Sequence, residues 1–407
     1  MSVIDVRSGQ VEKDYTVLVS GNRISYAGPA ASAPSLRGAR VVDGKGKFLI
    51  PGLWDMHIHG FLYVFSDFAG PLMIANGVTG ARDMGYYIDT TLRWKRDVAA
   101  GKEIGPRLVV GVRVDGAVNE ARFVAHVKTA EDGVRAVDTL ARRKDRTSRA
   151  DFFVIEKGIP RDAYFAIARE SKRLGLSIAG AVPHSVSIGE ASDSGQRSIE
   201  REDDLVRACT PYTATCRSVI TTLARNHTWV TPTLASYQPF AHGFDSASTH
   251  PELAKYVPGI VKGGWVRRAS AVTKADSMLV RGYFSFDRTR ELRDAGVKLL
   301  AGTDMPQTFM YPGFSLHDEL GLLVQSGLTP LEALQAATIN PAEALGLQGA
   351  LGTIDQGKTA DLVLLDGNPL ENIANTRRIF AVIANGRLFD RAALSQLLHQ
   401  VDSALKR

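Results

Sequence analysis

The stretch Phe48-Leu-Ile-Pro-Gly-Leu-Trp-Asp-Met-His-Ile-His-Gly60 joins an apolar run to two histidines that are two residues apart. In an extended strand successive side chains point to opposite faces, so His57 and His59 share one face while Met56 and Ile58 share the other. Imidazole nitrogens are common ligands of transition metals. The stretch therefore predicts a buried strand that ends at a metal site.

A His-x-His pair alone is weak support for a metal site, because histidines on exposed strands are common. Three neighbouring features strengthen it: the Pro-Gly turn at 51–52, the aromatic and acidic residues before the pair, and a downstream Ala301-Gly-Thr-Asp304. With them the chain resembles the amidohydrolase superfamily over nearly its whole length. The branch it resembles holds imidazolonepropionase-like proteins, Xaa-Pro dipeptidases and ochratoxin-hydrolysing amidohydrolases.

The length and composition are those of an ordinary globular protein. The chain has 407 residues, of which 44% are hydrophobic and 23% charged. This length exceeds one hydrophobic core, so we expect a barrel-sized domain and a smaller one. No apolar run is long enough to span a membrane, and no basic segment with an apolar core opens the chain. We therefore expect a cytoplasmic protein, or a secreted or periplasmic one if a signal peptide was trimmed.

The cysteines and the charge suggest no special class of partner. Cys209 and Cys216 make no disulfide framework in a chain of this size and match no zinc motif, so we predict free thiols. The net charge is +6, and its densest cluster, residues 142–149, lacks interleaved aromatic residues. We interpret this cluster as a solvated loop and expect no nucleic-acid or membrane partner. The expected partner is a small, anionic substrate molecule, and a homo-oligomer is left open.

Both ends of the chain are rich in short strands. Residues 15–20 and 23–28 alternate around Gly21-Asn22, which is the pattern of a β-hairpin, and further strand-like runs lie at 360–366 and 379–386. Neither end has enough strands to bury a face alone. We therefore predict one composite β-sandwich from residues 1–50 and 348–407, with a C-terminal helix, beside a catalytic domain over residues 51–347. The resemblance implies the same arrangement.

Between the two ends, strand-like runs alternate with helix-like runs. The eight strand candidates are residues 49–57, 78–84, 107–114, 151–156, 176–182, 197–201, 228–234 and 297–303. Eight β/α units predict a closed parallel (β/α)8 barrel, a TIM barrel. The structural alternative is a doubly wound open sheet, and the lack of any Gly-x-Gly-x-x-Gly turn argues against it.

Several helices have clear start signals. A helix that begins at Pro160 would place Tyr164, Ile167, Ala168 and Leu174 on one face. Thr129 with Asp132, Thr329-Pro-Leu-Glu332 and Asn340-Pro-Ala-Glu343 each combine a capping residue with an acid three residues later. We predict helix N-termini at all three.

The resemblance also shows which metal ligands this chain lacks. The family's two-metal site takes His-x-His from strand 1, a carboxylated lysine from strand 4, one histidine each from strands 5 and 6, and an aspartate from strand 8. His57, His59 and Asp304 match, but Val154, Ala181 and Arg201 stand at the other three positions. Valine and alanine cannot coordinate a metal, and arginine offers only donors. We therefore expect at most one ion, with zinc as the first choice.

Other residues near the expected site have competing interpretations. Glu156 lies two residues beyond Val154 and faces the same side. It can be interpreted as a substitute ligand, a substrate-binding residue or a solvated loop acid. Lys157 points the other way unless the strand bulges. His184 follows Pro183, where a surface role is favoured. For His227, beside the seventh strand, and His317, after the eighth, we expect structural hydrogen bonding.

The leading interpretation is a mononuclear metal-dependent hydrolase of an amide or other C–N bond, acting on a small molecule or a dipeptide-like substrate. Asp304 would shuttle protons, and Arg201 and Glu156 would bind substrate. The same trio of ligands also resembles the facial set of non-haem iron, although nothing else indicates oxygen chemistry. Two alternatives stay open: a lyase, isomerase or cyclase that uses Asp304 or Glu156 as acid or base, and a non-catalytic binding protein. Substrate specificity is expected in the loops 61–70, 113–122 and 238–265.

Overall fold

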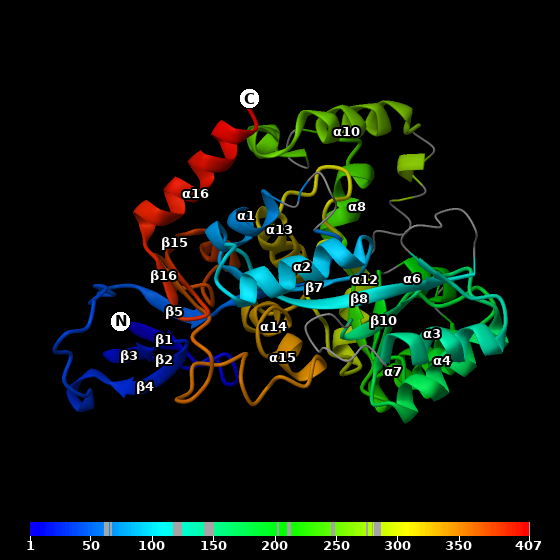
Figure 1. Ribbon diagram of the computed structural model, residues 1–407, viewed down its shortest axis with the longest axis horizontal. Helices are drawn as coiled ribbons and strands as arrows, with labels where there is room; N and C mark the ends of the chain where they lie inside the picture. The colour runs from blue at the N-terminus through cyan, green and yellow to red at the C-terminus, as the bar shows by residue number, and fades with distance from the viewer. Residues whose placement is uncertain are drawn as a thin grey trace.

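A computed structural model shows a barrel with a smaller sheet domain at one end (Figure 1). It describes residues 1–60, 65, 67–116, 124–141, 150–201, 203–209, 213–245, 249–273, 276–278, 280 and 286–406. The basic cluster 142–149 and parts of the three specificity loops lie outside the described residues. Among the helices of the described part, none is both long and apolar enough to cross a membrane.

The barrel is a parallel sheet whose strands follow one another in sequence order. Its main path consists of β6 (Leu53–Ile58), β7 (Val78–Asp83), β8 (Arg107–Asp115), β10 (Phe152–Ile155), β11 (Ser177–Gly180), β12 (Ser198–Glu200) and β13 (Trp229–Thr231). A short strand, β9 (Val124–His126), pairs with the end of β8 off this path. The predicted barrel is confirmed.

The eighth barrel position is filled by an irregular segment instead of the regular strand predicted for residues 297–303. Leu300 N donates to Val230 O at 2.9 Å, and Met56 N donates to Ala301 O at 2.8 Å. The segment therefore closes the barrel between β13 and β6. A Cβ atom on Gly302 would lie 2.6 Å from the Thr231 side chain and 2.8 Å from His57 Cβ. Glycine is needed there because the backbone passes too close for a side chain.

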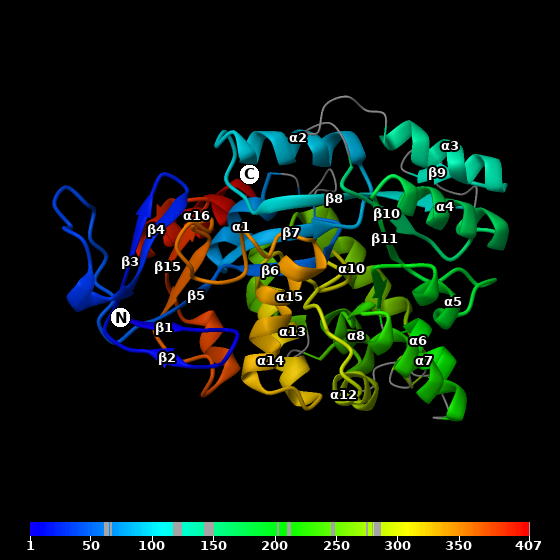
Figure 2. The same cartoon turned by 90° about the horizontal axis from the view of Figure 1, so that it is seen from below.

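The helices cover the outside of the barrel (Figures 1 and 2). They are α1 (Ala69–Ala75), α2 (Ile88–Ala99), α3 (Ala130–Ala141), α4 (Arg161–Arg173), α5 (Ile188–Asp193), α6 (Asp203–Cys209), α7 (Ala214–Arg225), α8 (Leu234–Ala241), α10 (Gly259–Ala271), α12 (Phe286–Asp294), α13 (Phe314–Gln325), α14 (Pro330–Ala336) and α15 (Ile339–Ala344). In α4 the predicted face is largely right: Tyr164, Ile167 and Ala168 are buried, whereas Leu174 caps the helix end and is partly buried.

Two of the three predicted helix starts are observed, and the third is wrong. Thr329 and Glu332 form a complete capping box at α14, and the Thr129 hydroxyl accepts a bond from Asp132 N before α3. Asn340, however, lies inside α15, which begins at Ile339 after Thr338. Its amide donates to Leu299 O at 2.9 Å. The side chain satisfies a carbonyl of the irregular eighth segment, a contact that local sequence does not reveal.

The prediction of free thiols is also wrong, because Cys209 and Cys216 form a disulfide. Cys209 ends α6 and Cys216 lies in the first turn of α7, and their Cα atoms are 4.7 Å apart. The end of α6 meets the start of α7, so the two cysteine side chains, seven residues apart in sequence, lie next to each other. Two cysteines seven residues apart in a long chain do not indicate a disulfide, so the bond was not predictable from the sequence.

Both chain ends build the smaller domain, as predicted (Figure 2). One sheet contains β1 (Ser2–Ile4), β2 (Val11–Glu12), β5 (Phe48–Pro51), β14 (Leu362–Leu365), β15 (Ile379–Ala384) and β16 (Arg387–Phe389), in the order β16-β15-β14-β5-β1-β2. The predicted hairpin is β3 (Tyr15–Ser20) with β4 (Arg23–Pro29). The C-terminal helix α16 (Arg391–Ala404) packs on α1. The domain boundaries at residues 50 and 348 stay a prediction.

The run 49–57, predicted as one strand, is split between the two domains. β5 ends at Pro51 and β6 begins at Leu53. Gly52 N donates to Asp361 O in the smaller domain at 2.7 Å, and Leu53 N donates to Gly77 O in the barrel at 3.0 Å. The chain therefore changes sheets at a single residue.

The close approach at Gly302 predicts a large effect of one added methyl group. We expect Gly302→Ala to lower the free energy of unfolding by about 1–3 kcal/mol, because the Cβ overpacks against Thr231 and His57. The control is Gly189→Ala in α5, where a Cβ meets nothing within 4 Å and helix propensity favours alanine by about 0.5–1 kcal/mol. Urea unfolding measures both, and equal stabilities for the two variants would contradict the assignment.

Candidate metal centre

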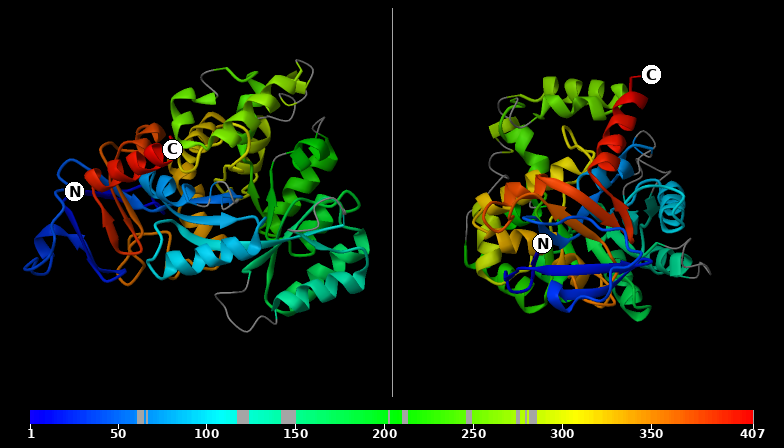
Figure 3. Two further views of the ribbon diagram at one scale, coloured as in Figure 1. Left: turned by 45° about the horizontal axis from the view of Figure 1, so that its top comes forward. Right: turned by 90° about the vertical axis from the view of Figure 1, so that its left-hand side faces the viewer.

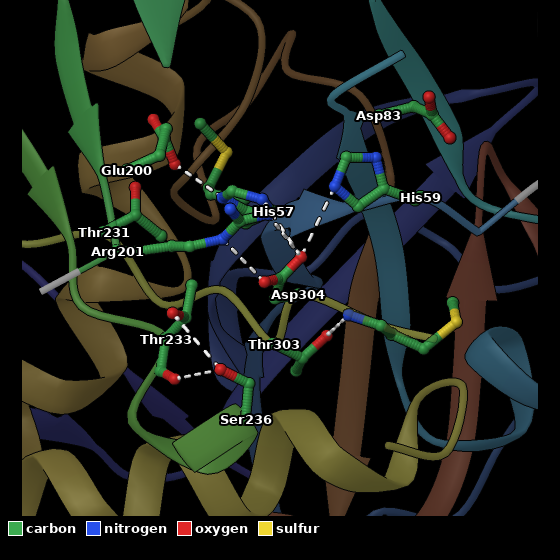
Figure 4. Close-up of polar contacts among 12 residues, drawn as sticks. His57, His59, Asp83, Glu200, Arg201, Thr231, Thr233, Ser236, Thr303 and Asp304 are labelled. Carbon is green, nitrogen blue, oxygen red and sulfur yellow. Dashed lines mark hydrogen bonds and ion pairs between the residues drawn. The ribbon is translucent and has the colours of Figure 1, made fainter. Parts of the chain in front are cut away.

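Three buried side chains converge at the mouth of the barrel (Figure 4). His57 and His59 come from the end of β6, and Asp304 follows the irregular eighth segment. Asp304 Oδ1 lies 3.3 Å from His57 Nε2 and 3.4 Å from His59 Nε2. One ligand atom from each residue lies within 4.8 Å of the other two. In the part of the chain that the structure describes, this is the one group of such residues able to hold a metal ion.

A buried aspartate, Asp55, fixes the segment that carries Asp304. Asp55 Oδ1 accepts a bond from Thr303 N at 3.0 Å, and Asp55 Oδ2 accepts one from the Thr303 hydroxyl at 2.7 Å. Burial raises the pKa of Asp55 to about 6, against the lowering effect of these bonds. Asp55 thus joins β6 to the segment that carries Asp304, whose own backbone adopts a left-handed φ of 56°.

The hydrogen bonds fix the tautomers of both histidines. His57 Nδ1 lies 2.9 Å from Glu200 Oε2, and His59 Nδ1 lies 3.1 Å from Gly85 O. A carbonyl and an ionised carboxylate only accept, so each Nδ1 carries a proton, and each Nε2 presents a lone pair when its imidazole is neutral. Both lone pairs face Asp304 Oδ1, and His57 Nε2 is buried without a hydrogen-bond partner. Two imidazole nitrogens and a carboxylate oxygen that face one another fit a bound cation.

A buried ion pair supports His57 from the barrel interior. Arg82 Nη2 donates to Glu200 Oε1 at 2.5 Å and Arg82 Nη1 donates to the Ser198 hydroxyl at 2.8 Å. Each of the two charged side chains is 3% exposed. Burial alone would raise the pKa of Glu200, but the charge of Arg82 and the bond from His57 lower it to about 2. Glu200 therefore stays ionised and orients the imidazole of His57.

Arg201 lies against the group as an internal cation. Arg201 Nε donates to Asp304 Oδ2 at 2.7 Å, and Nη2 lies 3.3 Å from Oδ1. A left-handed φ of 71° at Arg201 turns the chain after β12, so that adjacent Glu200 and Arg201 reach the same site. Although burial opposes ionisation, the charges of Arg201 and His57 hold the pKa of Asp304 well below its usual value. Asp304 is thus the carboxylate partner of Arg201.

The positions of the missing ligands are occupied by packing or by other pairs. Val154 is buried with Met84, Phe152 and Ala179 in one apolar cluster, and Ala181 is also buried. Both are therefore enclosed in the barrel wall. Glu156 is not part of the metal group in the described residues; it accepts a bond from Arg113 Nε at 2.8 Å.

Arg113 connects Glu156 to the metal group through an aromatic ring. Its guanidinium lies 5.0 Å from the ring centre of Tyr86, and the Tyr86 ring meets the His59 ring edge-on at 5.9 Å. Glu156 is thus separated from His59 by two side chains at the barrel mouth.

The remaining candidates lie outside the metal group. Lys157 pairs with Asp203 at 2.5 Å, which agrees with its predicted direction. His184 is exposed beside Arg207, and His227 is exposed in a turn with a φ of 52°. His317 is buried between the Thr376 hydroxyl and Asn76 O, where burial lowers its pKa to about 3.

Sequence reasoning missed the supporting residues Arg82 and Glu200. A weak signal was present: Arg82 interrupts the apolar run of a predicted buried strand, and Glu200 shares the strand face of Ser198. Charged residues are rarely fully buried without a partner. Two such residues, on the second and the sixth predicted strands, therefore call for partners, but the pattern alone does not say which residues pair.

The link between Glu200 and His57 predicts an effect on metal affinity. Glu200→Gln keeps an acceptor for His57 Nδ1–H but removes the charge, so we expect the affinity for zinc to fall about 10- to 100-fold. Competition with a chromophoric chelator measures it, and Glu12→Gln at an exposed position is the control. If Glu200→Gln binds zinc as tightly as the unchanged protein, Glu200 does not support the metal group.

Comparison with known proteins places this geometry in a family. The model of the amidohydrolase family matches residues 48–389. The imidazolonepropionase of Sphingopyxis alaskensis is 27% identical over an alignment 377 positions long, which covers 88% of this chain and 88% of that protein.

Solved structures agree in fold. A bottromycin amidohydrolase aligns with a TM-score of 0.79 at 22% identity, over 99% of this chain and 89% of that one. The ochratoxinase of Aspergillus niger aligns with a TM-score of 0.71 at 19% identity, over 96% and 94% of the two chains. The family match spans the barrel and its metal group together, so the chain belongs to the amidohydrolase family.

Proposed function

We propose that this protein hydrolyses an amide or another C–N bond of a small molecule with one divalent metal ion. The observation that carries the proposal is the convergence of His57 Nε2, His59 Nε2 and Asp304 Oδ1, with His57 Nε2 buried and without a hydrogen-bond partner. Two neutral imidazoles and a carboxylate are a donor set that suits zinc. The name of the Sphingopyxis relative, an imidazolonepropionase, supports the class of bond.

One ion rather than two follows from the neighbouring side chains. Val154 and Ala181 offer no ligand atom, and the guanidinium of Arg201 brings a permanent positive charge to Asp304. A second cation close to Arg201 would be repelled. In this proposal Arg201 takes the electrostatic place of a second ion, because it neutralises the carboxylate that the first ion leaves partly charged.

The residues of the chain divide the catalytic work. A bound zinc ion would supply a water molecule whose pKa lies near neutrality. Asp304 accepts the proton of the attacking water and returns it to the leaving nitrogen. Arg201 holds Asp304 in place, and a third of its side chain is exposed, so its remaining N–H groups can receive an anionic group of the substrate. Glu156, held by Arg113, would contact the substrate at the barrel mouth.

A second candidate function is favoured by one observation. Arg201 contacts both oxygens of Asp304, and a carboxylate whose proton affinity is lowered is a weak base. The protein would then reuse its pocket for a lyase, isomerase or cyclase reaction, or only bind its ligand. The two candidate functions differ in one observable: only the first predicts that the protein with one bound ion hydrolyses a C–N bond.

The first test combines metal content with hydrolysis. We expect elemental analysis after exhaustive dialysis to give one transition metal per chain, because one set of ligands is present. Asp304→Asn should lose the ion, and His184→Ala, at an exposed position, should keep it. Two ions per chain would refute the one-ion proposal. Release of amine from a panel of N-acyl amino acids and dipeptides should require the ion; one bound ion with ligand binding but no amine release would favour the second candidate.

The second test concerns Arg201. Arg201→Ala leaves the buried Asp304 without its cation, so we expect the metal-free protein to lose about 3–5 kcal/mol of stability. Added zinc should restore part of this loss, since the ion supplies positive charge at the same carboxylate. The control is Arg225→Ala, which breaks an exposed pair with Asp193 and should cost less than about 1 kcal/mol. Thermal unfolding with and without zinc measures both; equal losses in the two variants would show that Arg201 does not neutralise Asp304.

A further inference from the structure

A buried carboxyl group outside the metal group, that of Glu319, bonds the backbone at the start of α8. Glu319 lies in α13 and is fully buried. Its Oε2 accepts a hydrogen bond from Ala235 N at 2.7 Å. In the part of the chain that the structure describes, its Oε1 is buried and has no hydrogen-bond partner. The hydrogen bonding of this carboxyl group is therefore directed at the start of α8.

The helix α8 needs this acceptor because its own sequence supplies no cap. The first N–H groups of a helix have no acceptor within the helix, and the residue before it usually bonds one of them through its side chain. Thr233 stands at that position and makes no such bond. Figure 4 shows both of its oxygens bonded to the Ser236 hydroxyl instead. Glu319, 84 residues after Ala235, therefore replaces the local cap.

Contacts on either side of Glu319 make α13 a rigid base for it. The preceding residue, Asp318, pairs with Arg377 at 2.5 Å, and His317 Nε2 lies 3.1 Å from Asn76 O. The helix α8 packs against α13, and Figure 3 shows the green-to-yellow helices of this part of the chain close together. The carboxyl group is thus held in place before it meets α8.

The other side of the same turn bonds Arg201. Thr231 ends β13, three residues before α8 begins. Its carbonyl oxygen accepts a bond from Arg201 N at 2.8 Å, and its hydroxyl accepts one from Arg82 Nη2 at 3.3 Å. The backbone from Thr231 to Ala235 therefore has the candidate site on one side and Glu319 on the other.

Two left-handed residues make this turn sensitive to its supports. Arg201 has a φ of 71° and Thr233 a φ of 55°. In residues other than glycine such conformations cost free energy and persist only where neighbours fix them. The bond to Thr231 O fixes Arg201, and the bond from Ala235 N to Glu319 fixes the turn that contains Thr233. Since Thr231 and Thr233 are two residues apart, loosening the start of α8 would loosen the backbone that bonds Arg201.

We propose that Glu319 is a positioning residue of the candidate site, which holds the turn 231–235 and through it keeps Arg201 against Asp304. Arg201 Nε lies 2.7 Å from Asp304 Oδ2, so a shift of about 1 Å would break this hydrogen bond. The role of Glu319 in catalysis rests on the proposed function, in which Arg201 receives the substrate. Its effect on the contact between Arg201 and Asp304 requires neither metal nor substrate.

Two substitutions separate the hydrogen bond of Glu319 from its packing. Burial raises the pKa of Glu319 to about 8, and the charges of Asp55 and Asp318 add to this, so the carboxyl group is protonated at neutral pH. Glutamine has nearly the same shape, is neutral, and offers an oxygen that can accept from Ala235 N. Leucine fills similar space and offers no acceptor.

The experiment measures the rate at which phenylglyoxal modifies Arg201 in the metal-free protein, by mass spectrometry of its peptides. A third of the Arg201 side chain is exposed, and Asp304 protects its guanidinium. The rate is divided by that of the exposed Arg225 in the same sample. We expect Glu319→Leu to raise this ratio about three- to tenfold, as for the loss of one hydrogen bond, and Glu319→Gln to leave it unchanged.

The matched control removes a capping glutamate elsewhere in the barrel. Glu190→Leu breaks the capping box of α5, so it should lower stability and leave the Arg201 ratio unchanged. Arg288, which is 6% exposed, reports general loosening. If Glu319→Leu does not fold, Glu319→Asp decides the question, because its shorter side chain draws the carboxyl group away from Ala235 N and should also raise the ratio.

Four outcomes would overturn the proposal. They are an unchanged ratio in folded Glu319→Leu, an unchanged ratio in Glu319→Asp where the leucine variant does not fold, an equal rise in Glu319→Gln and Glu319→Leu, and modification of Arg288 as fast as that of Arg201 in Glu319→Leu. If the ratios behave as expected but the protein hydrolyses no C–N bond, the proposed function fails and the positioning of Arg201 by Glu319 stands.

Discussion

A chain of buried charges of alternating sign holds the candidate site together. It runs from Arg82 through Glu200 to His57, and from there through Asp304 to Arg201. Each carboxylate lies between two groups that carry or can accept positive charge, so none is left isolated in the barrel. Removing one member would leave its neighbour buried without compensation, which is far costlier than losing an exposed ion pair. The metal group therefore depends on residues that are not part of it.

Much of the fold followed from local sequence. The (β/α)8 barrel, the composite sandwich and the hairpin around Gly21-Asn22 were predicted, because strand alternation and turn residues act over a few positions. The errors have a common origin in contacts between distant parts of the chain. Asn340 lies inside α15 and donates its amide to the distant Leu299 O, and Cys209 meets Cys216 only when α6 and α7 are placed end to end.

The site was predictable to the same extent. His57, His59 and Asp304 carry a recognisable spacing, and the structure brings them together. Their environment was not predictable, since Glu200 and Arg82 matter only through neighbours across the barrel. Arg201 was marked as unusual by its position, but its direction depends on a left-handed turn that alternation does not foresee. Without that turn, two successive residues could not both reach one ligand group.

The change of sheets at Gly52 makes the two domains mechanically inseparable. Pro51 is paired with Leu362 in the smaller domain, and His57 lies six residues further along the same extended trace. A displacement of β5 along its axis would carry His57 with it, because no flexible linker intervenes. Domain exchange between relatives would therefore need to preserve two strand registers at once. A shift of the smaller domain would therefore reach the barrel mouth through the short extended segment from β5 to β6.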